Sequence, residues 1–281
     1  MNGKLYLCAT PIGNLGDITY RCVETLKSVD MIAAEDTRHT LGLLNHLNIE
    51  KPMTSYFEHN RREKGEYLIS EMKNGKNIAL VSDAGTPAIS DPGEDLVKLC
   101  AENGIEVVPI PGAVAGINAL IASGLPTGRF TFEGFLTVNK RGRSEMLESL
   151  KNEERTMIFY EAPHKLLTTL KDMKKAFGER KISLCRELTK LHEEFFRTTL
   201  SGAITFYEEN PPRGEFVLVV EGKSREEIME ETAREWEKMS VCEHVEMYIS
   251  EGMSEKDALK KTAQDRGVSK RDIYSEYKIN G

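Results

Sequence analysis

The chain has 281 residues, of which 40% are hydrophobic and 30% are charged, and its formal net charge at pH 7 is -7. This composition is typical of a globular protein that is large enough for two domains. No apolar run approaches the ~20 residues that a membrane-spanning helix needs. Because the net charge is negative, the chain as a whole does not attract nucleic acid. Binding of nucleic acid would depend on local basic patches.

In the first half, short apolar strands alternate with helices. Strands are predicted at residues 4–9, 30–34, 53–57, 77–81 and 105–110, and helices at residues 19–29, 38–47, 61–73, 94–103 and 113–123. This alternation is typical of a mostly parallel sheet with helices on both faces. Gly75, Gly104 and Gly124 each follow a predicted helix, where a residue with positive φ commonly ends it.

The second half has a different order of predicted strands and helices. A polar, basic linker is predicted at residues 137–144, after residues 130–136, and it precedes a helix at 145–150, a strand at 156–160 and a helix at 164–177. Strands at 182–186, 196–201 and 215–220 then follow one another without helices between them. Such a succession favours a mixed or antiparallel sheet.

The last segment is predicted to be helical, at residues 225–239, 240–252, 254–266 and 269–277, with N-caps at Ser254 and Ser269. A tail that resembles a helix-turn-helix is one interpretation. We therefore expect an α/β protein with an N-terminal domain at 1–136, a second α/β domain at 137–223 and a helical tail at 224–281.

The cysteines and histidines do not have the spacing of metal ligands. The five cysteines lie far apart without a Cys-x-x-Cys pair, and no histidine pair has ligand spacing. The N-terminal residues lead directly into a predicted strand and show no signal-peptide pattern. We therefore expect a protein of the reducing cytoplasm with no bound metal and no membrane partner.

The loop at residues 82–93 is the strongest sign of a ligand site. It holds two Asp, two Pro, two Gly and two Ser between a buried strand and a helix, whereas ~4–6 residues suffice for an ordinary connection. The loops at 9–17 and 111–116 also follow strands and contain glycine. Because open α/β sheets bind ligands at the carboxyl ends of their strands, we expect these three loops to form one wall of a cleft.

Charged residues follow two other predicted strands. Glu35 and Asp36 end the second strand, where acidic residues often bind a ribose hydroxyl, although these residues taken alone are better explained by a helix N-cap. Residues 186–194 contain six ionisable groups in nine positions. A solvated charged surface is the alternative to a site there.

Six segments, at residues 9–15, 35–38, 82–93, 132–136, 160–164 and 186–190, occur in an order that resembles the 16S rRNA (cytidine-2′-O)-methyltransferases of the tetrapyrrole methylase superfamily. This resemblance covers residues 5–222 and implies S-adenosylmethionine as methyl donor, a cleft between two α/β domains, a homodimer, and 16S rRNA of the small ribosomal subunit as partner. It places the donor against Pro11, Asp83, Ala84, Gly85, Thr86, Ile89, Ser90, Val114, Ala115, Tyr160, Glu161 and Leu188.

The implied reaction needs a group that orients or deprotonates a ribose hydroxyl. The candidates are Lys190, Glu187, Glu35 and Asp36, of which we favour Lys190. The RNA phosphates are expected to meet a local basic rim made of Arg38, Arg61, Arg62, Lys140, Arg141 and Arg143. Two alternatives remain open: a methylase of small, tetrapyrrole-type molecules, and an RNA-binding assembly factor without catalytic activity.

Overall fold

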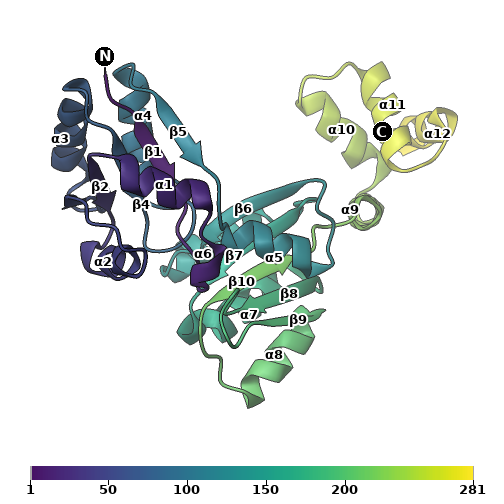
Figure 1. Cartoon of the computed structure of the whole chain (residues 1–281). Coiled ribbons are helices and arrows are strands. Elements are labelled where there is room, and N and C mark those ends of the chain that lie inside the picture. The colour runs from purple at the N-terminus through teal and green to yellow at the C-terminus, as the bar shows by residue number, and fades with distance from the viewer. Residues whose placement is uncertain (1, 281) are drawn as a thin grey trace. The chain divides into compact units, whose positions relative to one another are not determined.

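The computed structural model describes residues 2–280, apart from the side chains of residues 231–235, 237 and 280 (Figure 1). The chain forms two compact units. One contains the chain up to residue 150 together with residues 155–221. The other contains residues 151–154 and the chain from residue 222 onward. Within the described residues, no helix is both long and apolar enough to cross a membrane.

The first sheet is entirely parallel, as predicted, with the order β3-β2-β4-β1-β5. Its strands are β1 (Leu5–Cys8), β2 (Met31–Ala34), β3 (Met53–Ser55), β4 (Ile78–Val81) and β5 (Val107–Ile110). Central β4 is buried along its whole length, whereas Pro109 lies in the edge strand β5. Proline fits there because an edge strand need not donate every N–H to a neighbour.

Helices cover both faces of this sheet. They are α1 (Tyr20–Ser28), α2 (Thr37–His46), α3 (Arg61–Lys73) and α4 (Gly93–Glu102). Leu26 of α1 and Leu44 of α2 pack with Ile32 and Val81 on one face, and Leu68 of α3 and Leu96 of α4 share a cluster with other strand residues on the opposite face. The apolar strand residues therefore stabilise a three-layer arrangement.

The second sheet is mixed, also as predicted, with the order β6-β7-β10-β8-β9. Its strands are β6 (Phe130–Phe135), β7 (Thr156–Glu161), β8 (Lys181–Arg186), β9 (Glu194–Thr199) and β10 (Phe216–Val220). Only β6 and β7 pair in parallel, and the other neighbours are antiparallel. Every residue of β10 is buried, which suits the central strand of a sheet covered on both faces.

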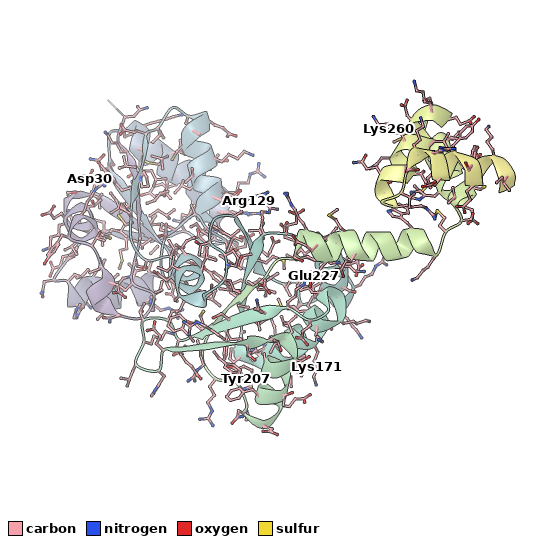
Figure 2. The ribbon with its side chains drawn as sticks, turned by 90° about the vertical axis from the view of Figure 1, so that its right-hand side faces the viewer. Asp30, Arg129, Lys171, Tyr207, Glu227 and Lys260 are labelled. Carbon is pink, nitrogen blue, oxygen red and sulfur yellow. The ribbon has the colours of Figure 1, made fainter. Side chains whose placement is uncertain are left out.

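Three helices cover one face of the second sheet: α6 (Lys140–Ser149), α7 (Pro163–Phe177) and α8 (Leu200–Glu209). Figure 2 labels Lys171 on α7 and Tyr207 on α8, and Lys171 pairs with Glu208 at 2.7 Å. The other face packs against α5 (Ala115–Ser123), through Ala119 and Leu120. Helix α5 thus follows the last strand of the first sheet in sequence but packs against the second sheet.

The second unit contains α9 (Arg225–Glu237), α10 (Val241–Ser250), α11 (Glu255–Asp265) and α12 (Lys270–Asn280). A capping box at Ser240 and Glu243 begins α10, and the Ser254 hydroxyl caps α11 as predicted. Helices α11 and α12 are joined by four residues that include Gly267 at φ 64°. The likeness of this tail to a helix-turn-helix stays a prediction.

Three sequence predictions differ from the structure. The expected linker is wrong, because α6 already begins at Lys140 with its N-cap at Asn139. Helix α8 was missed, since Gly202 and β-branched residues lower its helical propensity while the packing of Leu200, Ala203 and Tyr207 decides its form. The expected boundary after residue 136 also cuts off β6, although β6 pairs with β7 in the second sheet.

Candidate active site

The loops after β1, β4 and β5 are joined by hydrogen bonds at one edge of the first sheet. The N–H of Thr10 donates to the carbonyl of Gly85 at 2.9 Å, and the Thr86 hydroxyl donates to the carbonyl of Ala113 at 3.0 Å. Gly85 has φ 82°, and a Cβ there would lie 3.2 Å from the Ala113 oxygen. The three loops therefore form one continuous wall, as the sequence predicted.

Reciprocal hydrogen bonds link the ends of β2 and β4. The N–H of Asp36 donates to Asp83 Oδ1 at 3.1 Å, and the N–H of Asp83 donates to Glu35 Oε2 at 3.4 Å. Burial, opposed by the Asp83 N–H and aided by nearby Asp83 and Asp91 carboxylates, raises the pKa of Glu35. Glu35 therefore takes up a proton more readily than an ordinary exposed glutamate does.

The loop at 82–93 keeps a strained shape. Asp91 Oδ1 accepts hydrogen bonds from the N–H groups of Ala88, at 3.0 Å, and Gly93, at 2.7 Å. Within this loop, Ala88 and Ser90 have φ values of 67° and 63°, which side-chain-bearing residues rarely adopt. Glu187 and Thr189, on the opposite side of the cleft, have positive φ as well. Because strained backbone concentrates at functional sites, these four positions mark both loops as candidates.

A cavity of about 570 Å³ lies against these loops and the second sheet. Its volume falls within the usual range for small-molecule and cofactor sites, ~300–1,000 Å³. The predicted residues that line it are Glu35, Asp83, Ala84, Gly85, Thr86, Ile89, Ser90, Val114, Ala115, Tyr160, Glu161, Leu188 and Lys190. The structure thus brings together residues from several separate segments of the sequence.

Other lining residues were not predicted individually, although three of them, Ile12, Ser82 and Asp91, belong to the predicted loops. They are Ile12, Ser82, Asp91, Phe135, Ala162, Pro163, Cys185, Glu215, Phe216 and Val217. Cys185, Phe216 and Val217 are buried strand residues, whose apolar pattern indicates a core and gives no signal of a site. Pro11, Asp36 and Glu187 do not line the cavity, and Ile12 occupies the position expected for Pro11.

Asp36 is the N-cap of α2, which was the alternative interpretation of this residue. Its carboxylate accepts from the N–H of Arg38 at 2.8 Å and pairs with the Arg38 guanidinium at 2.7 Å. The hydrogen bonds from the Arg38 side chain and backbone lower the pKa of Asp36 well below its ordinary value. A carboxylate that is held and acidified in this way is a poor base, so Asp36 is removed from the candidates.

Lys190 reaches the cavity from the loop after β8. Its Nζ lies 3.0 Å from Glu187 Oε1 and 2.9 Å from Glu215 Oε2. Burial lowers the pKa of Lys190, but the hydrogen bonds to Glu215 and Glu187 outweigh that effect and leave the pKa above its ordinary value. Lys190 is therefore protonated at neutral pH, which suits a hydrogen-bond donor and not a base.

Glu187 positions this lysine. Besides binding Nζ, Glu187 Oε1 accepts the N–H of Glu215 at 2.9 Å, and this hydrogen bond is the main reason that the pKa of Glu187 is lowered. The adjacent Gly214 has φ 79°, and a Cβ there would lie 2.6 Å from the Glu187 side chain. Glu187 thus acts on the cavity through Lys190.

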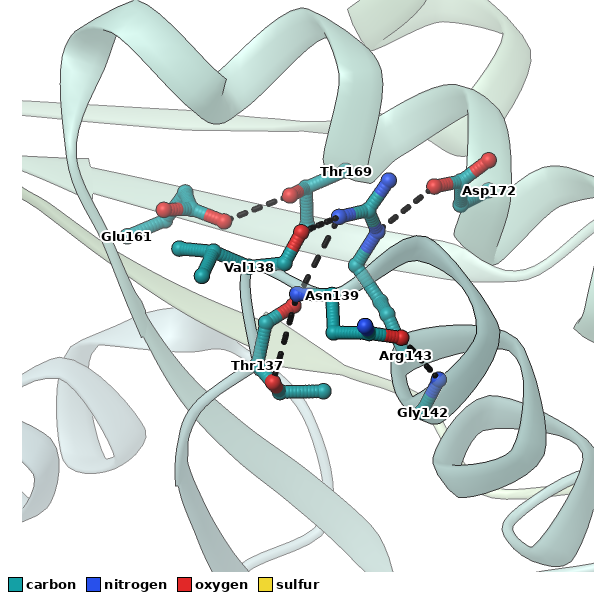
Figure 3. Close-up of polar contacts among 8 residues, drawn as sticks. All are labelled: Thr137, Val138, Asn139, Gly142, Arg143, Glu161, Thr169 and Asp172. Carbon is teal, nitrogen blue, oxygen red and sulfur yellow. Dashed lines mark hydrogen bonds and ion pairs between the residues drawn. The ribbon is translucent and has the colours of Figure 1, made fainter.

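Glu161 is a buried carboxylate on the cavity wall. One oxygen accepts the N–H of Ala162 at 2.8 Å, and the other accepts the hydroxyl of Thr169 on α7 (Figure 3). Its side chain is thereby fixed by the first turns of α7. Among the described residues, no group of three or more His, Cys, Asp or Glu side chains could hold a metal ion.

Comparison with known proteins identifies the family. A model of the tetrapyrrole (corrin/porphyrin) methylases matches residues 4–204. The chain belongs to this family. A Halalkalibacterium halodurans relative is 53% identical over 275 residues, covering 98% of this chain and 94% of its own. A Bacillus subtilis relative is 53% identical over 277 residues, covering 99% and 94%. Both relatives are named ribosomal RNA small subunit methyltransferase I.

Solved structures share the tetrapyrrole methylase fold. Uroporphyrin-III C-methyltransferase from Thermus thermophilus, complexed with S-adenosyl homocysteine, superimposes with a TM-score of 0.54. The match covers 78% of this chain and 97% of that one, at 17% identity. The predicted fold, with a parallel first sheet and a mixed second sheet, is therefore confirmed.

The six basic residues that were predicted to contact RNA in this tetrapyrrole methylase differ in their exposure and in their partners. Arg143 is mostly buried, and its guanidinium bonds Asp172 at 2.7 Å and the carbonyls of Thr137 and Val138 (Figure 3). Arg61 lies in a second, acidic cavity with Glu58 and Asp95. Both arginines thus have structural partners.

The other four basic residues are exposed. Arg38 pairs with Asp36, and Arg141 pairs with Glu145 at 2.8 Å, yet their side chains are 90% and 89% exposed. Such surface pairs are weak and open readily to a competing phosphate. Arg62 and Lys140 lie at the starts of α3 and α6 and are exposed as well. These four residues remain the candidates for contact with RNA.

Proposed function

We propose that this tetrapyrrole methylase transfers the methyl group of S-adenosylmethionine to the ribose 2′-hydroxyl of a cytidine in 16S rRNA. The names of its relatives support an RNA of the small ribosomal subunit as the class of substrate. The observation that carries the chemistry is the cavity itself, where one protonated lysine lies among carboxylates at the edge of the strained loops.

The residues present fit a donor of this kind. S-adenosylmethionine carries a positively charged sulfonium and an ammonium group beside its carboxylate. The carboxylates of Glu35, Asp83 and Asp91 line the side of the cavity formed by the first sheet, where they favour a cation. Leu188, in the loop after β8, and Val217, in β10, give an apolar floor, which suits the flat adenine ring.

The donor supplies a methyl group on a good leaving group, so the protein's task is mainly to align the reacting atoms. An ammonium group has three donor hydrogens, and Lys190 gives two of them to Glu187 and Glu215. The third is available to the acceptor oxygen. A fixed donor at this position stabilises the negative charge that develops on the hydroxyl oxygen.

Glu35 is our candidate for accepting the hydroxyl proton. Its raised pKa brings it nearer to the working pH than an exposed glutamate. It borders both the main cavity and the acidic second cavity. We further propose that the enzyme acts in the cytoplasm as a homodimer and meets RNA phosphates with Arg38, Arg62, Lys140 and Arg141.

The test is methylation of small ribosomal subunits from a strain that lacks this modification. The protein is incubated with labelled S-adenosylmethionine and 30S subunits, and the labelled nucleotide is mapped. Label on the ribose of one 16S rRNA cytidine is the expected result. Label on a base would contradict methylation of the ribose. Label only on an added tetrapyrrole would show that a small molecule, and not RNA, is the methyl acceptor. Binding of 30S subunits without binding of the donor would indicate an assembly factor.

A further inference from the structure

Strand β6 contains a bulge next to the cavity. In the parallel pairing of β6 with β7, Phe132 lies opposite Ile158, Gly134 opposite Phe159 and Phe135 opposite Tyr160. Glu133 is therefore an extra residue without a partner of its own. Gly134 supports the bulge with φ 63°, and a Cβ there would lie 3.3 Å from Ser90 Oγ.

The bulge changes the face on which Phe135 lies. Side chains alternate along a regular strand, so residues 132 and 135 would point to opposite faces of the sheet. The extra residue restores Phe135 to the face of Phe132 and Tyr160. Bulges commonly redirect a side chain beside an active site. Here the bulge takes an aromatic ring away from the core side of the sheet and directs it to the cavity.

Two aromatic contacts hold the ring of Phe135 in place through Tyr160. The rings of Phe135 and Tyr160 meet edge to face, with centroids 5.5 Å apart and planes at 68°. Tyr160 is itself held, because its hydroxyl accepts the N–H of Gly116 at 3.1 Å and its ring meets Phe132 at 5.1 Å. Phe135 is thus preorganised without being buried.

Phe135 lies at the mouth of the cavity. It is 61% exposed, whereas Leu188 is 7% and Phe216 is 2% exposed on the cavity floor. An exposed phenylalanine contributes little to the free energy of folding, because most of its apolar surface stays in water. The exposed ring of Phe135 is therefore accessible to a ligand in the cavity, and aromatic rings of this kind stack well on flat bases.

We propose that Phe135 stacks on the nucleobase of the nucleotide that is methylated. This inference rests on the proposed function, since it assumes an RNA acceptor. Proteins that recognise single-stranded or extruded nucleotides commonly stack the base on an aromatic side chain. The deeper floor then serves the donor, and the ring at the mouth holds the acceptor base so that its ribose reaches Lys190.

The experiment compares Phe135→Ala, Phe135→Leu and Phe135→Tyr with Phe130→Ala. Phe130 lies on the same strand and is 39% exposed, but it does not line the cavity. Steady-state methylation of 30S subunits gives KM and kcat, and calorimetry with S-adenosylhomocysteine gives donor affinity. We expect Phe135→Ala to raise the KM for 30S subunits at least about fivefold. Phe135→Leu should share this defect, Phe135→Tyr should restore KM, and Phe130→Ala should match the wild type.

Several results would overturn the inference. An unchanged KM in Phe135→Ala would show that the ring does not bind the acceptor. A loss of S-adenosylhomocysteine affinity with unchanged KM for 30S subunits would assign the ring to the donor. Full rescue by Phe135→Leu would show apolar packing without stacking. If instead the wild-type enzyme fails to methylate 30S subunits while binding the donor, the proposed function fails, and that outcome is separate from any effect of Phe135.

Discussion

Lys190 shows how a single side chain acquires a chemical role from its surroundings. Its ammonium group lies between the carboxylates of Glu187 and Glu215, and these partners keep it protonated despite partial burial. A lysine that loses its proton easily would need burial without such partners. The group therefore serves as a charged donor that is fixed at the cavity wall.

Substitution of Lys190 tests this role. We expect Lys190→Ala to lower kcat for methylation of 30S subunits about 100-fold, the usual cost of removing a donor that stabilises a developing oxyanion. Lys190→Arg should retain part of the activity, because it keeps the charge with a different geometry. Affinity for S-adenosylhomocysteine, measured by calorimetry, should stay near the wild-type value in both variants.

Lys181 offers a matched control for this experiment. It also pairs with a carboxylate, Glu221, at 3.2 Å, but it does not line the cavity. Lys181→Ala should therefore leave kcat unchanged. Full activity in Lys190→Ala would refute the catalytic role, and a parallel loss of donor affinity would make Lys190 a donor-binding residue. The kcat of the wild type should show no ionisation of Lys190 between about pH 6 and pH 9, because its pKa is raised from 10.5.

At the level of elements, the loop after β1 and the loop after β8 meet across the cleft. Gly13 is the contact point, since a Cβ there would lie 2.4 Å from Lys190 Cγ and 3.0 Å from the Leu188 carbonyl oxygen. The lysine can reach its place only because this position has no side chain. Gly13 is thus a positioning residue that acts through Lys190.

Gly13→Ala should displace Lys190 and lower kcat by at least about tenfold, because small misplacements of reacting groups carry large rate costs. The measurement is a double-mutant cycle of kcat with Lys190→Ala. We expect Gly13→Ala to add little further loss once Lys190 is truncated. An equal loss in both backgrounds would show that Gly13 acts by another route.

Gly42→Ala is the matched control for this substitution. Gly42 lies inside α2, and nothing lies within 4 Å of the Cβ that the substitution adds. Because alanine favours helix over glycine, this variant should keep wild-type kcat and gain about 0.5–1 kcal/mol in free energy of unfolding, measured by urea denaturation.

The elements also show what the sequence could predict. The first sheet and its loops follow from alternation and punctuation, because strand ends and glycine positions are local properties; Gly75, Gly104 and Gly124 all adopt positive φ as predicted. Phe135 and Glu215 could not be found in the same way. The role of Phe135 depends on a bulge in the pairing with β7, and Glu215 reaches Lys190 across 25 residues of sequence.

The whole molecule poses an electrostatic problem, because a chain with a net charge of -7 is proposed to bind RNA. We expect exposed basic side chains near the cavity to bind the RNA in spite of this net charge. Arg62 is the second residue of α3, the helix that follows β3, and Lys140 begins α6 five residues after Phe135. Both helices follow strands of the first compact unit, β3 and β6, and Phe135 at the end of β6 lines the cavity.

The double variant Arg62→Glu and Lys140→Glu tests whether this local charge binds RNA. We expect weaker binding of 30S subunits and a salt dependence of log Kd that is smaller by about one for each phosphate that the variant no longer binds. The measurement is Kd at several salt concentrations, with donor affinity as the check on folding. Phosphate contacts do not read sequence, so the methylated nucleotide should stay the same.

The matched control is the double variant Lys27→Glu and Lys73→Glu, which changes the net charge equally. Lys27 lies in the last turn of α1 just before β2, and Lys73 ends α3 just before β4, so both lie at the amino edge of the first sheet, opposite the cavity. If only the overall charge mattered, both double variants would weaken binding alike. If the local rim matters, the control should retain nearly wild-type Kd and salt slope, because charges beyond the Debye length of ~8–10 Å are largely screened from the bound RNA.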